Sequence, residues 1–211
     1  MKNYNIMLLR HGETEANEKG LYIGKTDIPL SENGVKGLEL MRESYFYPRP
    51  GKIYSSPLCR AIESVRVLFP DYPPEQIVVV PDLREMDFGI FEGLSALELS
   101  ELSTYKNWLA GGIDAAPPDG ESAREVLSRC LSAVDLIISD MMETGCTDSV
   151  LVAHSGIITN IICAFGLPKY NPRDIVPAFG AGYLISVSAH LWQTARTFEI
   201  IGLVPGQNTE E

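Results

Sequence analysis

Two of the chain's three histidines directly follow short apolar runs, and arginines stand close to the same places. His11 comes after "YNIMLLR", His154 comes after "SVLVA", and Arg60 lies one helical turn beyond "KIYSS". A neutral imidazole nitrogen can attack phosphorus, and a guanidinium group offers paired N–H donors to phosphate oxygens. These residue types at these places suit phosphoryl transfer through a phosphohistidine.

Two further residues belong to the same candidate site. Arg10 precedes His11 and adds a second guanidinium group, and Glu85 follows the apolar run "QIVVVP". Release of an alcohol from a phosphate ester needs a proton on the leaving oxygen, which a carboxylic acid can supply. Because arginine and imidazole groups neutralise the phosphoryl charge, the set calls for no metal and no other cofactor. We expect activity to survive a chelator.

Strand-like and helix-like segments alternate along the chain. Strands are expected at residues 4–9, 52–56, 76–81, 149–153, 182–190 and 195–204, the last two paired with each other. Helices are expected at residues 13–20, 31–42, 57–69, 122–145 and 155–166. Ser31 and Ser56 are expected as N-caps, with Pro57 in the first turn, and Ser122 with Glu125 matches a capping box.

This alternation predicts an α/β fold with three layers, in which helices cover both faces of a mostly parallel central sheet. The length and the 45% hydrophobic content fit one domain over residues 1–211. The apolar run at 76–81 is expected to be a strand buried on both faces. Because the carboxyl ends of parallel strands share one edge of the sheet, His11, Arg60 and His154 should converge there.

Four blocks in order, "LLRHGETEAN", "SSPLCRA", "REMDFGIFEG" and "VAHSG", resemble the histidine phosphatase superfamily, the phosphoglycerate mutase-like proteins. The resemblance extends over nearly the whole chain. It implies a phosphoglycerate mutase-like fold, His11 as the phosphorylated nucleophile, and Glu85 as the general acid and later the base for water. It also implies a phosphate pocket and a substrate-binding rim made of Arg10, Arg60, His154, Asn17, Ile23, Gly24 and Ser155.

Each of the main residues also has a purely structural interpretation. His11 could be a surface loop histidine bonded to its own backbone, Arg60 a helix-surface residue paired with Glu63 or Ser64, and Glu85 a member of a solvated charge cluster. The four blocks together outweigh these interpretations, although the role of Glu85 depends most on the resemblance. His190 is expected in a half-exposed strand or turn, without a catalytic role.

Charge and composition exclude several classes of protein. The 17 Lys and Arg residues against 28 Asp and Glu give a net charge of −11, which repels nucleic acid and anionic membrane. No apolar run has the length of a spanning helix, and residues 1–9 do not form a signal peptide. The four cysteines match no metal motif and are expected to be reduced. We expect a cytoplasmic monomer or homodimer whose partners are a small phosphorylated substrate and inorganic phosphate.

The resemblance leaves phosphatase and mutase open. Cofactor-dependent mutases carry extra basic residues after the acid glutamate, but the 68 residues between Glu85 and His154 contain only Lys106, Arg124 and Arg129 against twelve acidic residues. A phosphohistidine open to water favours hydrolysis, so a phosphomonoesterase is expected. A third possibility is a catalytically silent phosphate-binding regulator on the same fold, against which the presence of both His11 and Glu85 argues.

The segments "GLYIGKTDIPLS" and "PDGES" are most similar to the alpha-ribazole phosphatase branch, which suggests alpha-ribazole 5'-phosphate as a substrate. Two positions depart from the family pattern. Leu21 stands where many members have arginine, and Ile23 stands where a small polar residue is more usual. The rim near Gly24 is therefore expected to be more apolar, with Tyr22, Phe88 and Phe91 adding to a pocket for the leaving group.

Overall fold

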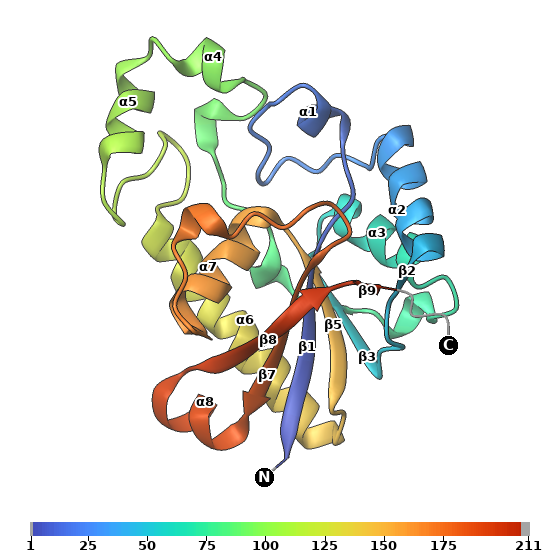
Figure 1. The fold of residues 1–211 in the computed structure, drawn as a ribbon. Helices are drawn as coiled ribbons and strands as arrows, with labels where there is room; N and C mark the ends of the chain where they lie inside the picture. Colours follow the sequence, from blue (N-terminus) through green and yellow to red (C-terminus); the bar gives the residue numbers. More distant parts are fainter. Residues whose placement is uncertain (1, 208–211) are drawn as a thin grey trace.

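The computed structural model describes residues 2–207, and its centre is a seven-stranded sheet in the order β4-β3-β5-β1-β7-β8-β6 (Figure 1). Four strands run parallel: β1 (Asn3–Arg10), β3 (Lys52–Ser55), β4 (Val78–Val79) and β5 (Asp148–Ala153). β7 (Gly182–Ser188) pairs antiparallel with both β1 and β8 (Phe198–Val204), and β6 (Gly166–Leu167) pairs parallel with β8. The mostly parallel sheet is thus confirmed, with an antiparallel addition beside β1.

Side chains of the central strands alternate between two apolar cores, which makes the fold three layers deep. Ile6 and Leu8 of β1 pack against α6 (Ala123–Thr144) and α7 (Ser155–Phe165). Met7 and Leu9 face the other way, toward α2 (Glu32–Ser44) and α3 (Cys59–Leu68). This period of two follows from the pleat of a strand, and it shows why the apolar run of β1 is continuous.

Two of the expected helix starts are confirmed, and one is wrong. Ser31 caps α2 by accepting from the Gly34 amide, and Ser122 forms a capping box with Glu125 at the start of α6. α3, however, begins at Cys59 with Leu58 as its N-cap and no side-chain cap. The Ser56 hydroxyl instead lies 2.7 Å from the His154 ring, and it also accepts from the amide of Leu58, the residue before α3, at 3.3 Å.

The run at 76–81 is not a buried strand. β4 has two residues and lies at the sheet edge, where Val79 is 47% exposed. A continuous apolar run does not distinguish an edge strand with loop residues from a central strand. The last two expected strands do pair, but α8 (Ala189–Ala195) lies between them, and His190 is exposed in that helix and not in a strand or turn.

The remaining elements are short. α1 (Glu15–Glu18) follows β1 and ends before Gly20, as expected. α4 (Ala96–Leu99) and α5 (Ser103–Ala110), the latter not anticipated, lie beyond the carboxyl ends of the parallel strands in Figure 1. The others are the pair β2 (Tyr45–Phe46) and β9 (Gly206–Gln207) and four 3₁₀ turns at Pro74–Gln76, Pro81–Leu83, Gly89–Phe91 and Pro172–Asp174.

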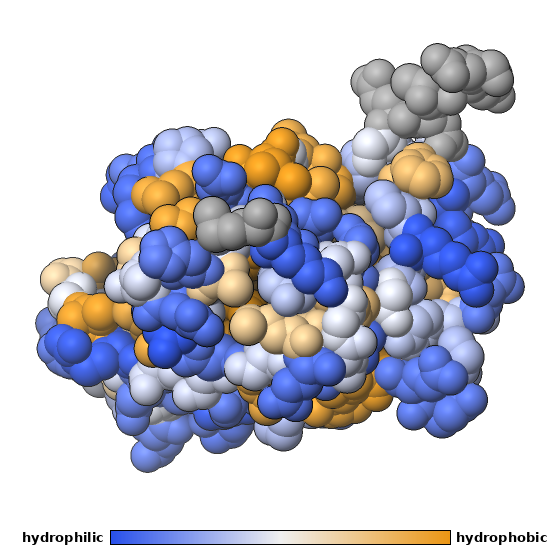
Figure 2. All heavy atoms as spheres, turned by 90° about the horizontal axis from the view of Figure 1, so that it is seen from below, coloured by the Kyte–Doolittle hydropathy of each residue, from blue (hydrophilic) through white to orange (hydrophobic). Residues whose placement is uncertain are grey.

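Figure 2 views the molecule from the end where the parallel strands begin, and it shows a mostly hydrophilic surface with separate hydrophobic patches. Over residues 2–207, the helices are all too short or too polar to cross a membrane.

Candidate active site

The two buried histidines follow neighbouring strands that end at the same level. β1 and β5 pair in parallel with Arg10 opposite Ala153, so His11 and His154 emerge side by side. The His11 amide donates to the Ala153 carbonyl at 3.0 Å, and the centroids of the two imidazole rings are 5.0 Å apart. The expected convergence at the carboxyl edge of the sheet is therefore observed for these two side chains.

The His11 ring has a fixed tautomer. Its Nδ1 atom lies 2.5 Å from the Gly12 carbonyl oxygen, which can only accept, so Nδ1 carries the proton and Nε2 keeps its lone pair. Burial, together with the Arg60 and Arg10 charges, lowers the pKa of His11 to about 3, although the bond to the Gly12 carbonyl opposes the shift. The imidazole is therefore neutral near pH 7, with Nε2 able to act as a nucleophile. The residue does bond to its neighbouring backbone, but it is buried and not on the surface.

Two arginines lie beside this ring without a carboxylate partner. Arg10 donates to the Pro177 carbonyl at 3.0 Å, with its guanidinium carbon 3.9 Å from the Phe179 ring centroid. Arg60 is 2% exposed and donates to the carbonyls of Gly24 and Thr26 at 2.7 and 3.0 Å. Within residues 2–207, neither forms an ion pair with Asp or Glu. Their charges remain for an anionic ligand.

The surface interpretation of Arg60 is wrong, because the residue is buried, Glu63 does not pair with it, and Ser64 bonds only to its backbone carbonyl. The Glu63 carboxylate accepts from the Leu30 amide at 2.8 Å instead. The Arg60 carbonyl accepts from Ser64 at 2.6 Å, and the same hydroxyl accepts from the Gly12 amide at 2.8 Å. One serine side chain thus ties the turn after His11 to the first turn of α3.

His154 is fully buried, and its two ring nitrogens have different surroundings. Nε2 lies 2.7 Å from the Ser56 hydroxyl, whereas Nδ1 has no hydrogen-bond partner in the described part of the chain. Burial lowers the pKa of His154 well below its usual value, with the nearby His11 and Arg60 adding to the effect. If the Ser56 hydroxyl donates to Nε2, the proton is on Nδ1, which can then donate to a ligand oxygen.

Glu85 lies among these cationic groups and is 8% exposed, so the solvated-cluster interpretation is wrong. Its carboxylate accepts from the Met86 amide at 2.9 Å and from the Gly156 amide, in the first turn of α7, at 3.1 Å. Burial raises the pKa of Glu85, and these two bonds together with the Arg60 and Arg129 charges oppose that shift. A carboxyl group with a raised pKa can hold a proton for transfer.

Two glycines permit the close contacts around Glu85. A Cβ atom on Gly156 would lie 2.6 Å from the Glu85 Oε1 atom, so a side chain there would displace the carboxyl group. A Cβ atom on Gly24 would lie 1.7 Å from the Met86 carbonyl oxygen. The second contact joins the loop that holds Arg60 to the segment that carries Glu85.

Three of the expected substrate-binding residues have other contacts. The Asn17 side-chain oxygen accepts from the Thr14 amide and hydroxyl, which caps α1. Ile23 lines an apolar hollow of about 350 Å³ with Ala16, Leu21 and residues 28–30. Ser155 is the first, half-buried residue of α7. Among the described hydrogen bonds, none links these three to His11, His154 or Glu85.

The aromatic residues expected around a leaving group form a small core of their own. Phe91 is fully buried with Leu99 and Tyr105, so it cannot line a pocket. Tyr22 and Phe88 are half-buried on the same cluster, and their ring centroids lie 5.1 Å apart. Only these two keep exposed surface for a substrate.

Sequence reasoning missed several residues of the site. Ser56 was interpreted as a helix cap, and Ser64 stands one turn after Arg60, a spacing that could have indicated a shared face of α3. Phe179 lies with its ring centroid 6.3 Å from that of His11, on a loop whose sequence carries no periodic signal. Its contact with Arg10 is visible only in three dimensions.

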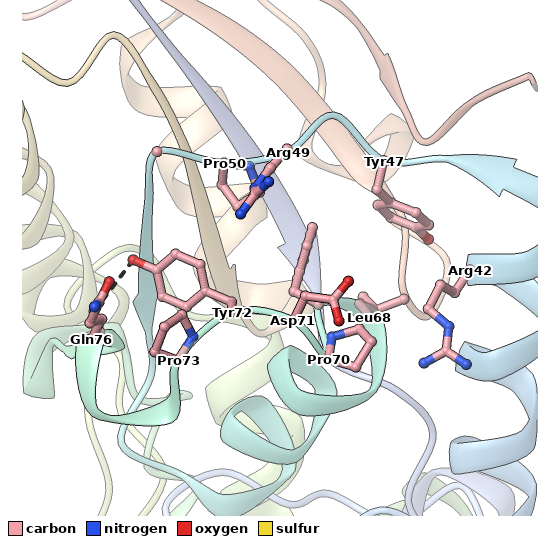
Figure 3. A pocket seen from close by; sticks show the side chains of 12 residues that line it. Arg42, Tyr47, Arg49, Pro50, Leu68, Pro70, Asp71, Tyr72, Pro73 and Gln76 are labelled. Atoms are coloured by element: carbon pink, nitrogen blue, oxygen red, sulfur yellow. Dashed lines mark hydrogen bonds between the residues drawn. The ribbon is translucent and has the colours of Figure 1, made fainter.

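A separate hollow of about 870 Å³ lies where β3 begins and α3 ends, away from the carboxyl edge of the sheet (Figure 3). Tyr47, Arg49 and Tyr72 are among its lining residues. It contains neither histidine nor Glu85, and we assign it no role. Among residues 2–207, no group of three or more His, Cys, Asp or Glu side chains could hold a metal ion.

A family model described as "Histidine phosphatase superfamily (branch 1)" matches residues 6–198. The chain belongs to this superfamily. The expected family is therefore confirmed, and this histidine phosphatase carries the two histidines, two arginines and one glutamate of the site within the matched residues.

Two curated relatives are phosphatases of small molecules by name. A glucosyl-3-phosphoglycerate phosphatase from Mycolicibacterium vanbaalenii is 32% identical over 197 residues, which cover 90% of this histidine phosphatase and 86% of the relative. An adenosylcobalamin/alpha-ribazole phosphatase from Salmonella typhimurium is 28% identical over 164 residues, which cover 74% and 77% of the two chains.

A solved structure supports the fold. The crystal structure of a putative alpha-ribazole-5'-P phosphatase from Escherichia coli K-12 matches with a TM-score of 0.79 at 23% identity. The match covers 98% of this histidine phosphatase and 99% of the other chain. A phosphoglycerate mutase from Bacillus anthracis also matches, with a TM-score of 0.75 at 22% identity over 95% of this chain and 92% of the other, which confirms the expected phosphoglycerate mutase-like architecture.

Proposed function

We propose that the protein is a metal-independent phosphomonoesterase that hydrolyses a small phosphorylated metabolite through a phosphohistidine. The observation that carries this proposal is the state of His11: a buried, neutral ring whose Nδ1–H is held by the Gly12 carbonyl. Two guanidinium groups without carboxylate partners lie on the same edge. This combination supplies a nucleophile and the charge that a phosphoryl group requires.

In the first half-reaction, the lone pair of His11 Nε2 attacks phosphorus and the bond from phosphorus to the ester oxygen breaks. Glu85 gives its proton to that oxygen, and the alcohol leaves. Arg10, Arg60 and the Nδ1–H of His154 bind the phosphoryl oxygens while charge develops on them. The raised pKa of Glu85 favours the protonated form that this step needs.

In the second half-reaction, Glu85 acts as a base. Its carboxylate takes a proton from a water molecule, whose oxygen attacks phosphorus as the bond to His11 Nε2 breaks. Inorganic phosphate leaves, and both His11 and Glu85 return to their starting protonation states. One carboxyl group serves both steps because the first step leaves it ionised.

The basic residues between Glu85 and His154 favour a phosphatase over a mutase. Lys106, Arg124 and Arg129 pair with Glu101, Asp114 and Glu121, at 3.4, 2.5 and 3.0 Å respectively. A mutase must hold a second phosphate group, and these cations already have carboxylate partners. The named activities of the relatives make alpha-ribazole 5'-phosphate and phosphorylated glycerate derivatives the first substrates to assay.

Trapping the intermediate tests the proposal. Acid-labile label should appear on the wild-type protein after a quench with ³²P-labelled ester, and should be absent from His11→Ala. Label on His11→Ala would remove His11 from its role, and a lack of label and of phosphate release across a panel of monoesters would support the silent phosphate-binding alternative. Conversion of 3-phosphoglycerate to 2-phosphoglycerate with 2,3-bisphosphoglycerate, without free phosphate, would instead support the mutase.

A further inference from the structure

Glu85 stands on a stretch of backbone with no strand or long helix to hold it. The segment passes from a 3₁₀ turn at Pro81–Leu83 to another at Gly89–Phe91, and residues 84–88 have no regular structure. A proton donor must nevertheless keep its carboxyl group within hydrogen-bond reach of the leaving oxygen. Side-chain contacts must therefore supply the rigidity that the backbone lacks.

Arg129, on α6, contacts this segment on both sides of Glu85. Its Nη1 atom donates to the Asp82 carbonyl at 2.8 Å and to the Arg84 carbonyl at 2.6 Å. The side chain is only 8% exposed. Because α6 is a helix of 22 residues that packs along the sheet, it fixes the two carbonyls relative to the core.

Glu121 completes the contact from the residue just before the Ser122 cap of α6. Its two carboxylate oxygens accept from Nε and Nη2 of Arg129, both at 3.0 Å, as a bidentate pair. The same carboxylate accepts from the Asp87 amide at 3.0 Å and from Arg84 Nη2 at 2.6 Å. The backbone is thus held at residues 82, 84 and 87, which bracket Glu85.

The bonding of Arg129 distinguishes it from the two arginines that face the phosphate pocket. Four hydrogen bonds occupy its guanidinium group, and a carboxylate neutralises its charge. A buried ion pair with its hydrogen bonds satisfied has little capacity left for a ligand. Two of its bonds go to the segment that carries Glu85 and two go to Glu121, and its charge lowers the pKa of Glu85, so it acts on the reaction through Glu85 and not through a ligand.

We infer that Arg129 and Glu121 form a clamp that positions the carboxyl group of Glu85 for proton transfer. The inference rests on the proposed function, in which Glu85 protonates the leaving oxygen. Both are positioning residues and touch no substrate. Loss of the clamp should lower kcat/KM for substrates whose leaving group needs a proton, and should leave kcat/KM nearly unchanged for substrates whose leaving group does not.

The test compares kcat/KM for an alkyl phosphate and for p-nitrophenyl phosphate, because kcat/KM reports the steps up to formation of the phosphohistidine. The nitrophenolate leaves without a proton, whereas the alkoxide cannot. Arg129→Gln and Glu121→Gln should each lower kcat/KM for the alkyl ester by about 10- to 100-fold, since a displacement near 1 Å can cost about 100-fold. The value for p-nitrophenyl phosphate should fall less than about threefold.

Three further variants complete the design. Arg124→Gln removes an exposed arginine that lies on the same helix as Arg129 and pairs with Asp114. This variant should leave kcat/KM for both esters unchanged. The double variant Arg129→Gln/Glu121→Gln should lose no more than either single one, because each substitution opens the same clamp. Glu85→Gln removes the proton donor itself, so it should show the largest difference between the losses of kcat/KM for the alkyl and the aryl ester. If Arg129→Gln does not fold, as judged by its thermal melt, Glu121→Gln preserves side-chain volume and carries the test.

The outcomes separate the clamp from the proposed function. A selective loss in Glu85→Gln and in the clamp variants supports both. A selective loss in Glu85→Gln, with equal losses or no loss on the two esters in the clamp variants, overturns the clamp alone. Equal losses on both esters in Glu85→Gln itself would remove Glu85 as the acid, and the clamp would fall with it.

Discussion

The two halves of the site that we propose to bind phosphate and to donate a proton are held in place by different kinds of structure. His11, Arg60 and His154 stand at the ends of paired strands or in the first turn of a helix, so backbone hydrogen bonds fix their places. Glu85 stands on an irregular segment that depends on Arg129 and Glu121. Both halves are buried and charged, but the backbone of the sheet positions the residues of one half and side-chain hydrogen bonds position the glutamate of the other.

The arginines of the two halves also differ in their hydrogen-bond and ion-pair partners. Arg10 and Arg60 donate to backbone carbonyls, which leaves their positive charge uncompensated, whereas Arg84 and Arg129 share the carboxylate of Glu121. In a chain of net charge −11, unpaired buried arginines are costly for folding unless a ligand uses them. The difference supports the proposed binding of the phosphoryl group by Arg10 and Arg60 and a structural role for Arg84 and Arg129.

The largest expected effect is on the phosphate side. Arg60→Ala should lower kcat/KM by about 1000-fold for every ester, because the charge it supplies is needed whatever the leaving group. Arg60→Lys should recover only part of this loss, since an ammonium group cannot reproduce the planar fork. The matched control is Arg66→Ala, an exposed residue of the same helix. A loss of kcat/KM confined to alkyl esters would show that Arg60 acts on the proton transfer and would contradict its assignment to the phosphate half.

The next effect is on the proton-donating side. Glu85→Gln should lower kcat/KM by about 100-fold for alkyl phosphates and far less for activated aryl phosphates. Because the pKa of Glu85 is raised by burial, the wild-type rate with alkyl esters should fall as rising pH ionises it. This fall should vanish in Glu85→Gln, and its persistence would point to another acid. Glu75→Gln, exposed in a 3₁₀ turn, is the control.

A stability measurement tests the burial of the nucleophile. The pKa of His11 is about 3 in the folded protein against 6.5 in a model peptide, so between these values the unfolded state binds a proton that the folded state does not. Folding stability should therefore fall on acidification by about 1.4 kcal/mol per pH unit from this residue, or about 2 kcal/mol between pH 6 and 4.5.

The variant His11→Asn should show a correspondingly shallower dependence of unfolding free energy on pH in urea titrations, with the residual slope from the other groups, His154 among them. Identical slopes for His11→Asn and the wild type would show that the His11 ring is solvated in solution.

The smallest expected effect comes from a residue that belongs to one half and acts on the other. Glu92 follows the Glu85 segment, yet it accepts from the Lys25 and Thr26 amides at 2.9 and 3.0 Å. Those residues belong to the loop whose carbonyls hold Arg60. Glu92→Gln removes one acceptor oxygen and should lower kcat/KM about tenfold on alkyl and aryl esters alike.

The exposed Glu101→Gln is the matched control for this prediction. If Glu92→Gln lowered kcat/KM only for alkyl esters, Glu92 would act through Glu85. The contact with Lys25 and Thr26 would then serve the proton-donating half of the site.

The sequence predicted the sheet-borne half of the site better than the other half. Strand ends are visible in sequence because an apolar run stops abruptly, so His11 and His154 could be placed at one edge from periodicity alone. Glu85 needed the family resemblance because it follows a run that forms only a two-residue edge strand. The roles of Glu121 and Arg129 could not be found, since the backbone groups of residues 82, 84 and 87 that they hold are far away in the chain.

Tertiary packing also determined several helices and side-chain contacts that could not be predicted from local sequence. α5 and α8 were missed because they are short. The apolar residues of α5 face a small local cluster, whereas α8 contributes Trp192 to the main core. The Ser56 cap was wrong because a serine at the end of a strand can bond to a histidine on the neighbouring strand instead of a helix amide. Asn17 illustrates a similar limit, since its oxygen caps α1.

The aromatic cluster near α5 has a consequence for optical measurement. The chain has two tryptophans. Trp108 is half-exposed, with its ring centroid 6.0 Å from those of both Tyr22 and Phe88. Trp192 is buried in α8 and stacks on Phe198, 6.4 Å between centroids. A ligand that reaches Tyr22 or Phe88 should alter the emission of the first indole and leave the second constant, which gives the protein an intrinsic fluorescent reporter with its own internal reference.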